Sequence, residues 1–191
     1  DAFTRHTKEI TENRLQTLSA EYNIAMTAAL EHFTAMMADL FFAEKDMLEG
    51  ADSRVRAMFA WHAIEEMEHK AVAFDVMQKV ANVGYGLRVT AMTHATLAFS
   101  LYTVIAPWHM LKMDGYSTRE RLTMYAKGLP WLVGPRKGVL GRLLPMIGSY
   151  YKPGFHPNHI PTVHNYRAWL DAFVATGDPM RAADAMHRAA A

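Results

Sequence analysis

The chain has 191 residues, of which 51% are hydrophobic and 20% are charged, and this composition excludes a disordered protein and favours one globular domain. It contains no cysteine, which excludes disulfides and thiolate metal sites and fits a reducing compartment. The formal net charge of +1 lacks the basic balance of a nucleic-acid-binding protein. We therefore expect a cytoplasmic protein with no nucleic-acid partner.

The N-terminal part of the chain predicts three helices in succession. The first covers residues 3–18 and the second covers residues 19–43, with Ser19 in the position of an N-cap. Apolar residues recur close to a 3.6-residue period along the second helix. A third helix begins at Asp52 or Ser53 and continues to about residue 82, where a glycine-containing stretch ends it.

A fourth helix is predicted over about residues 87–106, ahead of Pro107. This segment is apolar and roughly as long as a membrane span, but threonine, serine and histidine interrupt it. We favour a buried bundle helix over an embedded one.

The rest of the chain carries all of its prolines and most of its glycines, which predicts an irregular extension with short helices over about residues 161–175 and 179–190. No strand pattern is present. The class is therefore all-α, in which residues 1–106 form part of a helical bundle and residues 107–191 pack on it within one domain.

Charge is segregated along the chain. Residues 1–80 hold fourteen acids and eight bases, whereas residues 112–152 hold eight bases and two acids. The basic stretch also contains tryptophan, leucine and tyrosine, which is the composition of a membrane-surface segment. We favour an ordinary solvated basic edge, and the alternative is peripheral membrane contact through residues 107–152.

Ionisable residues are concentrated in the segment WHAIEEMEHKAVAFDVM. On a helix that turns about 100° per residue, Glu66 lies about 40° from His62, and His69 lies about 20° from it. Glu65 lies about 60° away on the other side, and Glu68 falls off this stripe. A Glu-x-x-His unit such as Glu66 and His69 is the spacing that dinuclear four-helix-bundle proteins use to direct a carboxylate and an imidazole at the same pair of ions.

A further candidate ligand lies in the preceding helix, in the segment ALEHFTA. Glu31 is surrounded there by apolar residues, and an ionised glutamate in such a place is costly unless it is paired or bound to metal. His32 points about 100° away and is not expected to be a ligand. The predicted ligands are Glu31, His62, Glu66 and His69, with Glu65 either a ligand or a support for one. Oxygen and nitrogen donors without sulfur suit two Fe or Mn ions and, less well, Zn.

These motifs, together with YYKPGFHP near the C-terminus, resemble a bacterial family of predicted metal-dependent hydrolases with a ferritin-like helical core. The resemblance covers about residues 22–160. The His-x-x-x-Glu-x-x-His arrangement is also similar to that of the di-iron arylamine N-oxygenases, and this likeness implies that His62 is the additional imidazole.

The resemblance also implies an upstream helix pair with a further glutamate and a second Glu-x-x-His-type motif. His6, Glu9 and Glu12 on the first helix do not match that motif. We therefore expect the chain to hold half of the ligand set. The other half would come from a removed N-terminal segment, from another chain or, less favoured, from a two-fold homodimer.

The donor set leaves three functions open. The first, which we favour at this stage, is O2-dependent oxidation of an apolar or lipid-like substrate. The second is metal-dependent hydrolysis, in which a bimetallic site activates water. The third is a non-catalytic metal-binding or lipid-associated protein. The histidines of PGFHPNH and His164 after it are expected to lie in a loop that packs over the end of the bundle.

Overall fold

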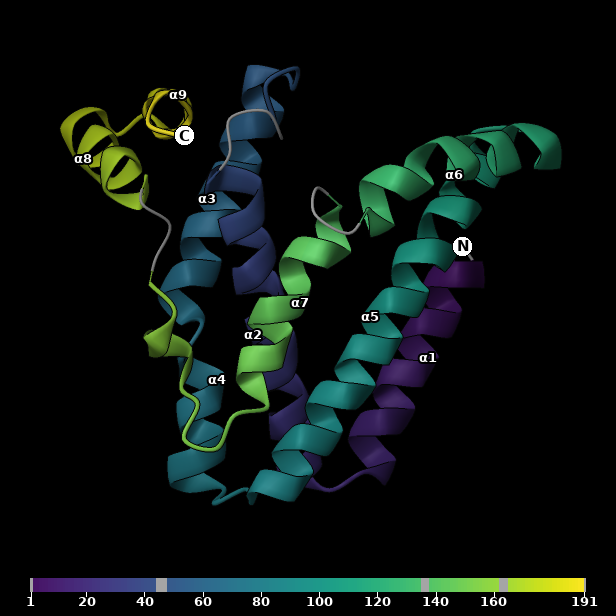
Figure 1. Cartoon of the computed structure of the whole chain (residues 1–191), viewed down its shortest axis with the longest axis vertical. Helices are drawn as coiled ribbons and strands as arrows, with labels where there is room; N and C mark the ends of the chain where they lie inside the picture. The colour runs from purple at the N-terminus through teal and green to yellow at the C-terminus, as the bar shows by residue number, and fades with distance from the viewer. Residues whose placement is uncertain (1, 44–47, 135–137, 162–164, 191) are drawn as a thin grey trace.

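The computed structural model describes residues 2–43, 48–134, 138–161 and 165–190 (Figure 1). Within these ranges the protein is helical almost throughout and contains no strand, which confirms the all-α class. The elements are α1 (Ala2–Thr17), α2 (Ala20–Ala43), α3 (Ser53–His69), α4 (Val72–Asp75), the π-helical turn η2 (Val76–Val80), α5 (Tyr85–Met113), α6 (Thr118–Val133), α7 (Val139–Tyr150), the 3-10 turn η3 (Pro157–His159), α8 (Tyr166–Thr176) and α9 (Pro179–Arg188).

Local capping signals set the starts of several helices, as the sequence predicted. Ser19 Oγ accepts a hydrogen bond from the backbone N–H of Tyr22 at 3.2 Å, just before α2. Asp52 caps α3 by accepting from the backbone N–H of Arg54 at 2.9 Å. Pro179 opens α9, where its missing N–H costs nothing. These helix starts depend on neighbouring residues and can therefore be read from the sequence alone.

The third predicted helix is interrupted after His69, which is a difference from the single helix expected over residues 52–82. A turn at Lys70 and Ala71 separates α3 from α4, and the wider η2 follows. After this break Phe74 and Met77 are buried in a core between α2 and α5 that α3 does not reach. Burial of these two large side chains stabilises the change of direction.

The long helix α2 connects two hydrophobic cores. Its first part packs with α4, α5 and α7 around Phe33, Phe74 and Tyr150. Its last part packs with α3, α8 and α9 around Phe42 and Trp169. Figure 1 shows α8 and α9 beside the N-terminal part of α3, away from the lower part of α5. Both the first and the last part of α2 are thus packed against other helices. This packing fixes the face of α2 that contacts α3.

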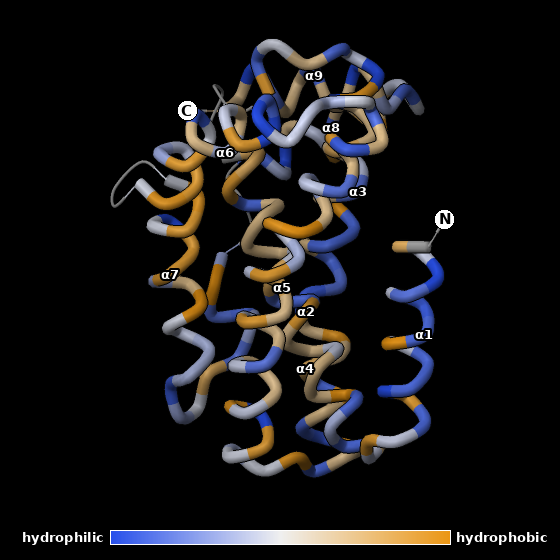
Figure 2. The backbone as a smooth tube through the Cα atoms, turned by 90° about the vertical axis from the view of Figure 1, so that its right-hand side faces the viewer, coloured by the Kyte–Doolittle hydropathy of each residue, from blue (hydrophilic) through white to orange (hydrophobic). Residues whose placement is uncertain are grey.

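The chain beyond Ala95 differs from the expected fold. Ala91, Met92 and Ala95 of α5 are buried, as predicted for a bundle helix, but the rest of α5 is largely exposed. The helix also continues through Pro107 to Met113, at the cost of one backbone hydrogen bond. The predicted extension of short helices contains α6 and α7, each with a proline inside it. Figure 2 shows long hydrophobic stretches on α5 and α7 and a mostly hydrophilic α1.

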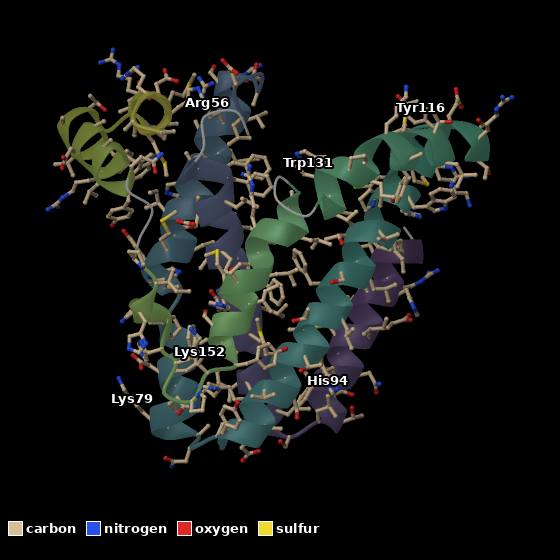
Figure 3. All side chains as sticks on the ribbon, viewed as in Figure 1. Arg56, Lys79, His94, Tyr116, Trp131 and Lys152 are labelled. Carbon is tan, nitrogen blue, oxygen red and sulfur yellow. The ribbon has the colours of Figure 1, made fainter. Side chains whose placement is uncertain are left out.

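Two polar contacts hold the C-terminal helices against α2 and α3. The buried side-chain amide of Asn165 donates to the carbonyl oxygens of Phe42 at 2.6 Å and Met186 at 3.0 Å. Arg56 of α3 forms an ion pair with Asp184 of α9 at 2.8 Å. Figure 3 labels Arg56 at this end of the molecule. The upper part of the α2–α3 pair is therefore supported from the side opposite α5.

Candidate metal centre

Within the predicted site, Glu66 lies on α3 and its carboxylate contacts both α2 and a histidine of its own helix. Its Oε2 accepts a hydrogen bond from Thr34 Oγ1 at 2.5 Å. Its Oε1 lies 3.4 Å from His62 Nε2, one helical turn earlier, where the Glu66 side chain is 17% exposed and the His62 side chain 58%. Thr34 Oγ1 also lies 3.0 Å from the carbonyl oxygen of Glu31, but its single hydrogen binds the charged carboxylate of Glu66 more strongly than a carbonyl. Thr34 therefore fixes the Glu66 carboxylate across the helix interface.

Glu31 lies on α2 one turn before Thr34 and is partly buried. Its pKa is raised, first because burial removes water from the carboxyl group and second because Glu66 is negatively charged. The charge of His69 opposes this rise. Glu31 of α2 therefore interacts electrostatically with Glu66 and His69 of α3, which are the two helices that the sequence predicted.

The remaining candidates on α3 occupy different environments. His69 is the last residue of α3 and is exposed, whereas Glu65 is partly buried. Glu68 points elsewhere, because its carboxylate accepts a hydrogen bond from the Tyr166 hydroxyl of α8 at 2.8 Å. This contact agrees with the predicted helical phase, in which Glu68 lies off the stripe that carries the candidate ligands.

The donor chemistry fits a divalent ion, but the coordination is incomplete. Carboxylate and imidazole groups without sulfur suit Fe, Mn or Zn. In the part of the chain that the structure describes, no three histidine, aspartate or glutamate side chains are close enough together to hold one ion. The exposed side chains of His62 and His69 have room to change rotamer. Glu66 is the fixed donor around which such a site would close.

His32 is adjacent to Glu31 but belongs to the core. It is buried against Tyr150 and Phe155, and its Nε2–H donates to the carbonyl oxygen of Met146 at 3.2 Å. Burial lowers the pKa of His32 to about 4, so the ring is neutral at physiological pH. The side chain stabilises the contact between α2 and α7 and does not face Glu66.

The C-terminal histidine motif forms a loop that packs on the bundle, as the sequence indicated. His156 Nδ1 accepts from the backbone N–H of Asn158 at 3.2 Å, so Nε2 carries the hydrogen and donates to Asp75 at 3.1 Å. The same ring contacts Phe74 edge-on. His159 accepts from the His156 backbone N–H at 3.3 Å. His164 lies outside the described residues.

An apolar cavity of about 250 Å³ adjoins the acidic cluster. Its walls come from the C-terminal half of α2 and from α3, and its polar side consists of Thr34, His62 and Glu66. Sequence analysis did not identify the cavity or Thr34. The threonine follows Glu31 by three residues and therefore shares its helix face, which is a usable signal. The cavity has no such signal, because its walls are distant in the sequence.

The fold and this cluster define an all-α protein with carboxylates and imidazoles gathered between two helices beside an apolar cavity. Residues 1–160 match the family described as predicted metal-dependent hydrolase, and the chain belongs to that family. No curated protein and no solved structure matched the chain significantly.

Family membership confirms the main sequence resemblance and implies a metal cofactor. The matched region includes both donor helices and ends at Ile160, so α8 and α9 lie outside it. The match favours hydrolysis, which was the alternative function, over oxidation, which was the favoured one. It does not bear on the likeness to ferritin-like proteins or arylamine N-oxygenases, which stays a prediction.

Proposed function

We propose that the protein is a metal-dependent hydrolase whose ion is held by Glu31, Glu66 and His69 between α2 and α3. The observation that supports this most strongly is the hydrogen bond by which Thr34 of α2 holds the Glu66 carboxylate of α3 across the helix interface, one helical turn from Glu31. Mutual repulsion of two carboxylates raises the free energy of the metal-free site, and a cation between them removes that cost. The family description supplies the reaction class.

Each residue has a distinct role in this proposal. Thr34 holds Glu66 in one orientation through the 2.5 Å hydrogen bond. His62, which is exposed and 3.4 Å from the second Glu66 oxygen, can accept or donate a proton at the edge of the cavity. Glu65 either completes the ligand set or supports it. A bound divalent ion supplies Lewis acidity toward water and toward the substrate oxygen.

We further propose that additional donors come from outside this cluster, because no three histidine, aspartate or glutamate side chains among the described residues are close enough together to hold one ion. Two ions, Fe or Mn in preference to Zn, would need four or more carboxylates and imidazoles. A further polypeptide segment or a second copy of the chain would supply them, as the sequence suggested. In a two-fold dimer, two copies of Glu31, Glu66 and His69 would provide four glutamates and two histidines.

Anaerobic turnover after metal replacement tests the proposed reaction. The chain is treated with chelator, and Mn²⁺, Fe²⁺ or Zn²⁺ is returned before p-nitrophenyl hexanoate and bis-p-nitrophenyl phosphate are offered. We expect metal-dependent hydrolysis of one of them without oxygen, lost in Glu66→Gln and retained in Glu68→Gln. Oxygen consumption without anaerobic hydrolysis would instead favour oxidation. Metal binding with neither activity would favour the non-catalytic alternative.

A further inference from the structure

The strongest feature that the reaction class leaves unexplained is the cavity beside Glu66. We propose that this cavity binds the medium-length apolar chain of a neutral acyl substrate, with the polar end of that substrate at Glu66 and His62. The proposal deepens the hydrolase function and depends on it only for the bond that is cleaved. Binding of the chain itself can be measured without metal and without turnover.

The walls of the cavity match an uncharged chain. Apart from its polar side, the cavity is lined by Met37, Ala38, Phe41, Phe42, Leu48, Phe59 and Ala63. Phe59 is 47% exposed although it is a large aromatic residue. An apolar surface that lines a concave site and carries a few polar groups at one side is typical of ligand pockets. The exposed ring of Phe59 marks the edge at which a chain would enter.

The volume limits the length of the chain. An apolar cavity of about 150 Å³ binds benzene, which has six carbons. A cavity of about 250 Å³ is about 1.7 times as large as that one and therefore accommodates an apolar chain of about ten carbons. A longer chain would have to leave the cavity past Phe59. This size excludes full insertion of a sterol or of a long membrane-lipid chain.

Charge at the polar side selects the head group. Glu66 lies on the polar side of the cavity, so a carboxylate placed beside it in the metal-free protein puts two negative charges together. A neutral ester or alcohol avoids that repulsion, and an alcohol can donate a hydrogen bond to Glu66. In the metal-free protein the cavity should therefore prefer a neutral head group to the anion of a free fatty acid.

Calorimetry with a series of n-alcohols from butanol to tetradecanol tests this binding on the metal-free full chain. We expect the affinity to rise about four-fold with each methylene until about ten carbons and then to level off. Octanoate should bind at least ten-fold more weakly than octanol. Absence of binding, or affinity that does not depend on chain length, would overturn the proposal. Tighter binding of octanoate would overturn the head-group assignment.

Two variants that change the cavity in opposite directions locate the binding. Ala38→Leu adds three carbons to a lining residue, so the plateau should move about three carbons shorter. Phe59→Ala opens the edge and should move the plateau longer, which keeps the test decisive if Ala38→Leu does not fold. Met58→Ala changes an exposed neighbour outside the cavity and should leave the series unchanged. An unchanged plateau in both cavity variants would contradict the assignment.

The outcomes separate this proposal from the proposed function. Normal alcohol binding with no metal-dependent hydrolysis would leave the cavity assignment intact and remove the reaction. Metal-dependent hydrolysis without alcohol binding would support the reaction and remove the cavity assignment.

A separate observation on α5 supports a second inference. We infer that the outer faces of α5 and α6 bind an anionic lipid surface. Among the described helices, α5 alone is long and apolar enough to cross a membrane, yet only 17% of its most apolar 18-residue window is buried. A core helix of a soluble protein would be mostly covered. Leu97 and Leu101 are 64% and 58% exposed, and Val104 and Ile105 continue the same helix face.

Helix α6 and the surrounding charge fit a lipid surface better than a protein partner. Leu122, Leu129, Trp131 and Val133 of α6 are also exposed. Figure 3 labels Trp131 of α6 and Tyr116 of the turn before it, and such aromatic side chains suit a membrane interface. Three exposed bases lie on α5 and α6, namely Lys112, Arg119 and Lys127, against the two acids Asp114 and Glu120, which favours negatively charged head groups. The buried N-terminal part of α5 keeps this contact peripheral.

Vesicle sedimentation tests the lipid surface. The full chain should sediment with vesicles of phosphatidylcholine and phosphatidylglycerol, and less with phosphatidylcholine alone or in high salt. Leu97→Ser combined with Leu101→Ser should reduce the bound fraction at least five-fold, whereas Leu15→Ser, on the exposed side of α1, should not. No sedimentation, or equal binding of the double variant, would overturn the inference. A dimer that the double variant converts to a monomer, without vesicle binding, would assign this face to a second copy.

Discussion

Replacement of Thr34 by valine should weaken both the fold and metal binding, because it removes one hydrogen bond and little else. Valine has nearly the shape of threonine, so the cavity keeps its wall. A hydrogen bond to a charged group contributes about 1.5–3 kcal/mol when it is buried. The Glu66 side chain is 17% exposed, and water can partly replace the lost donor, so we expect a loss near the lower limit.

The same substitution should also weaken metal binding. A residue that orients a ligand typically changes metal affinity by about 10-fold to 100-fold when it is removed. We expect Mn²⁺ to bind Thr34→Val at least about 10-fold more weakly, while Thr34→Ser, which keeps the hydroxyl, stays close to wild type. Urea unfolding measures the stability and isothermal titration calorimetry measures the affinity. Equal metal affinity in wild type and Thr34→Val would refute the role of this hydrogen bond.

Three further substitutions test other parts of the structure. Burial raises the pKa of Glu31, so the folded state retains this proton to a higher pH than the unfolded state, and stability falls as pH rises through the folded pKa. Urea unfolding at pH 7 without metal should show Glu31→Gln to be more stable than wild type by roughly 0.5 kcal/mol, allowing for solvent screening. This gain in stability should shrink toward pH 4. A destabilised variant would contradict the predicted sign. Asn165→Ala removes two buried hydrogen bonds and should lower the free energy of unfolding by about 2–3 kcal/mol without changing metal affinity, whereas Asn158→Ala in an exposed loop should change it little. Tyr166→Phe, which removes the contact to Glu68, should cost less than about 1 kcal/mol in thermal unfolding and leave metal binding intact; weaker binding would mean that Glu68 belongs to the site.

The sequence was sufficient for those parts of the fold that depend on local signals. The caps at Ser19 and Asp52 and the proline at the start of α9 act within one helical turn. The break after His69 was not predictable in this way, because it depends on burial of Phe74 against distant helices. Pro107 also misled the prediction, because an exposed helix tolerates the loss of one hydrogen bond.

The candidate site was predictable to a similar extent. Helical spacing placed Glu66 and His69 on one stripe and Glu68 off it, and the contact of Glu68 with α8 agrees with that phase. Glu31 was recognisable from its apolar neighbours in the preceding helix. The orientation of Glu66 by Thr34 could not be predicted, since it requires the rotation of α2 relative to α3. The cavity could not be predicted either, because it also depends on how α2 and α3 pack against each other.

The measurement that most directly tests the central claim is a calorimetric titration of metal-free protein with Mn²⁺ and Fe²⁺, under reducing conditions, on three forms of the full chain. These are wild type, Glu66→Gln and Glu68→Gln, which remove two acids only two residues apart on α3. The account predicts that wild type and Glu68→Gln bind the ion, whereas Glu66→Gln does not. Equal loss in both variants, or no binding by the wild type, would contradict a metal centre built on this stripe.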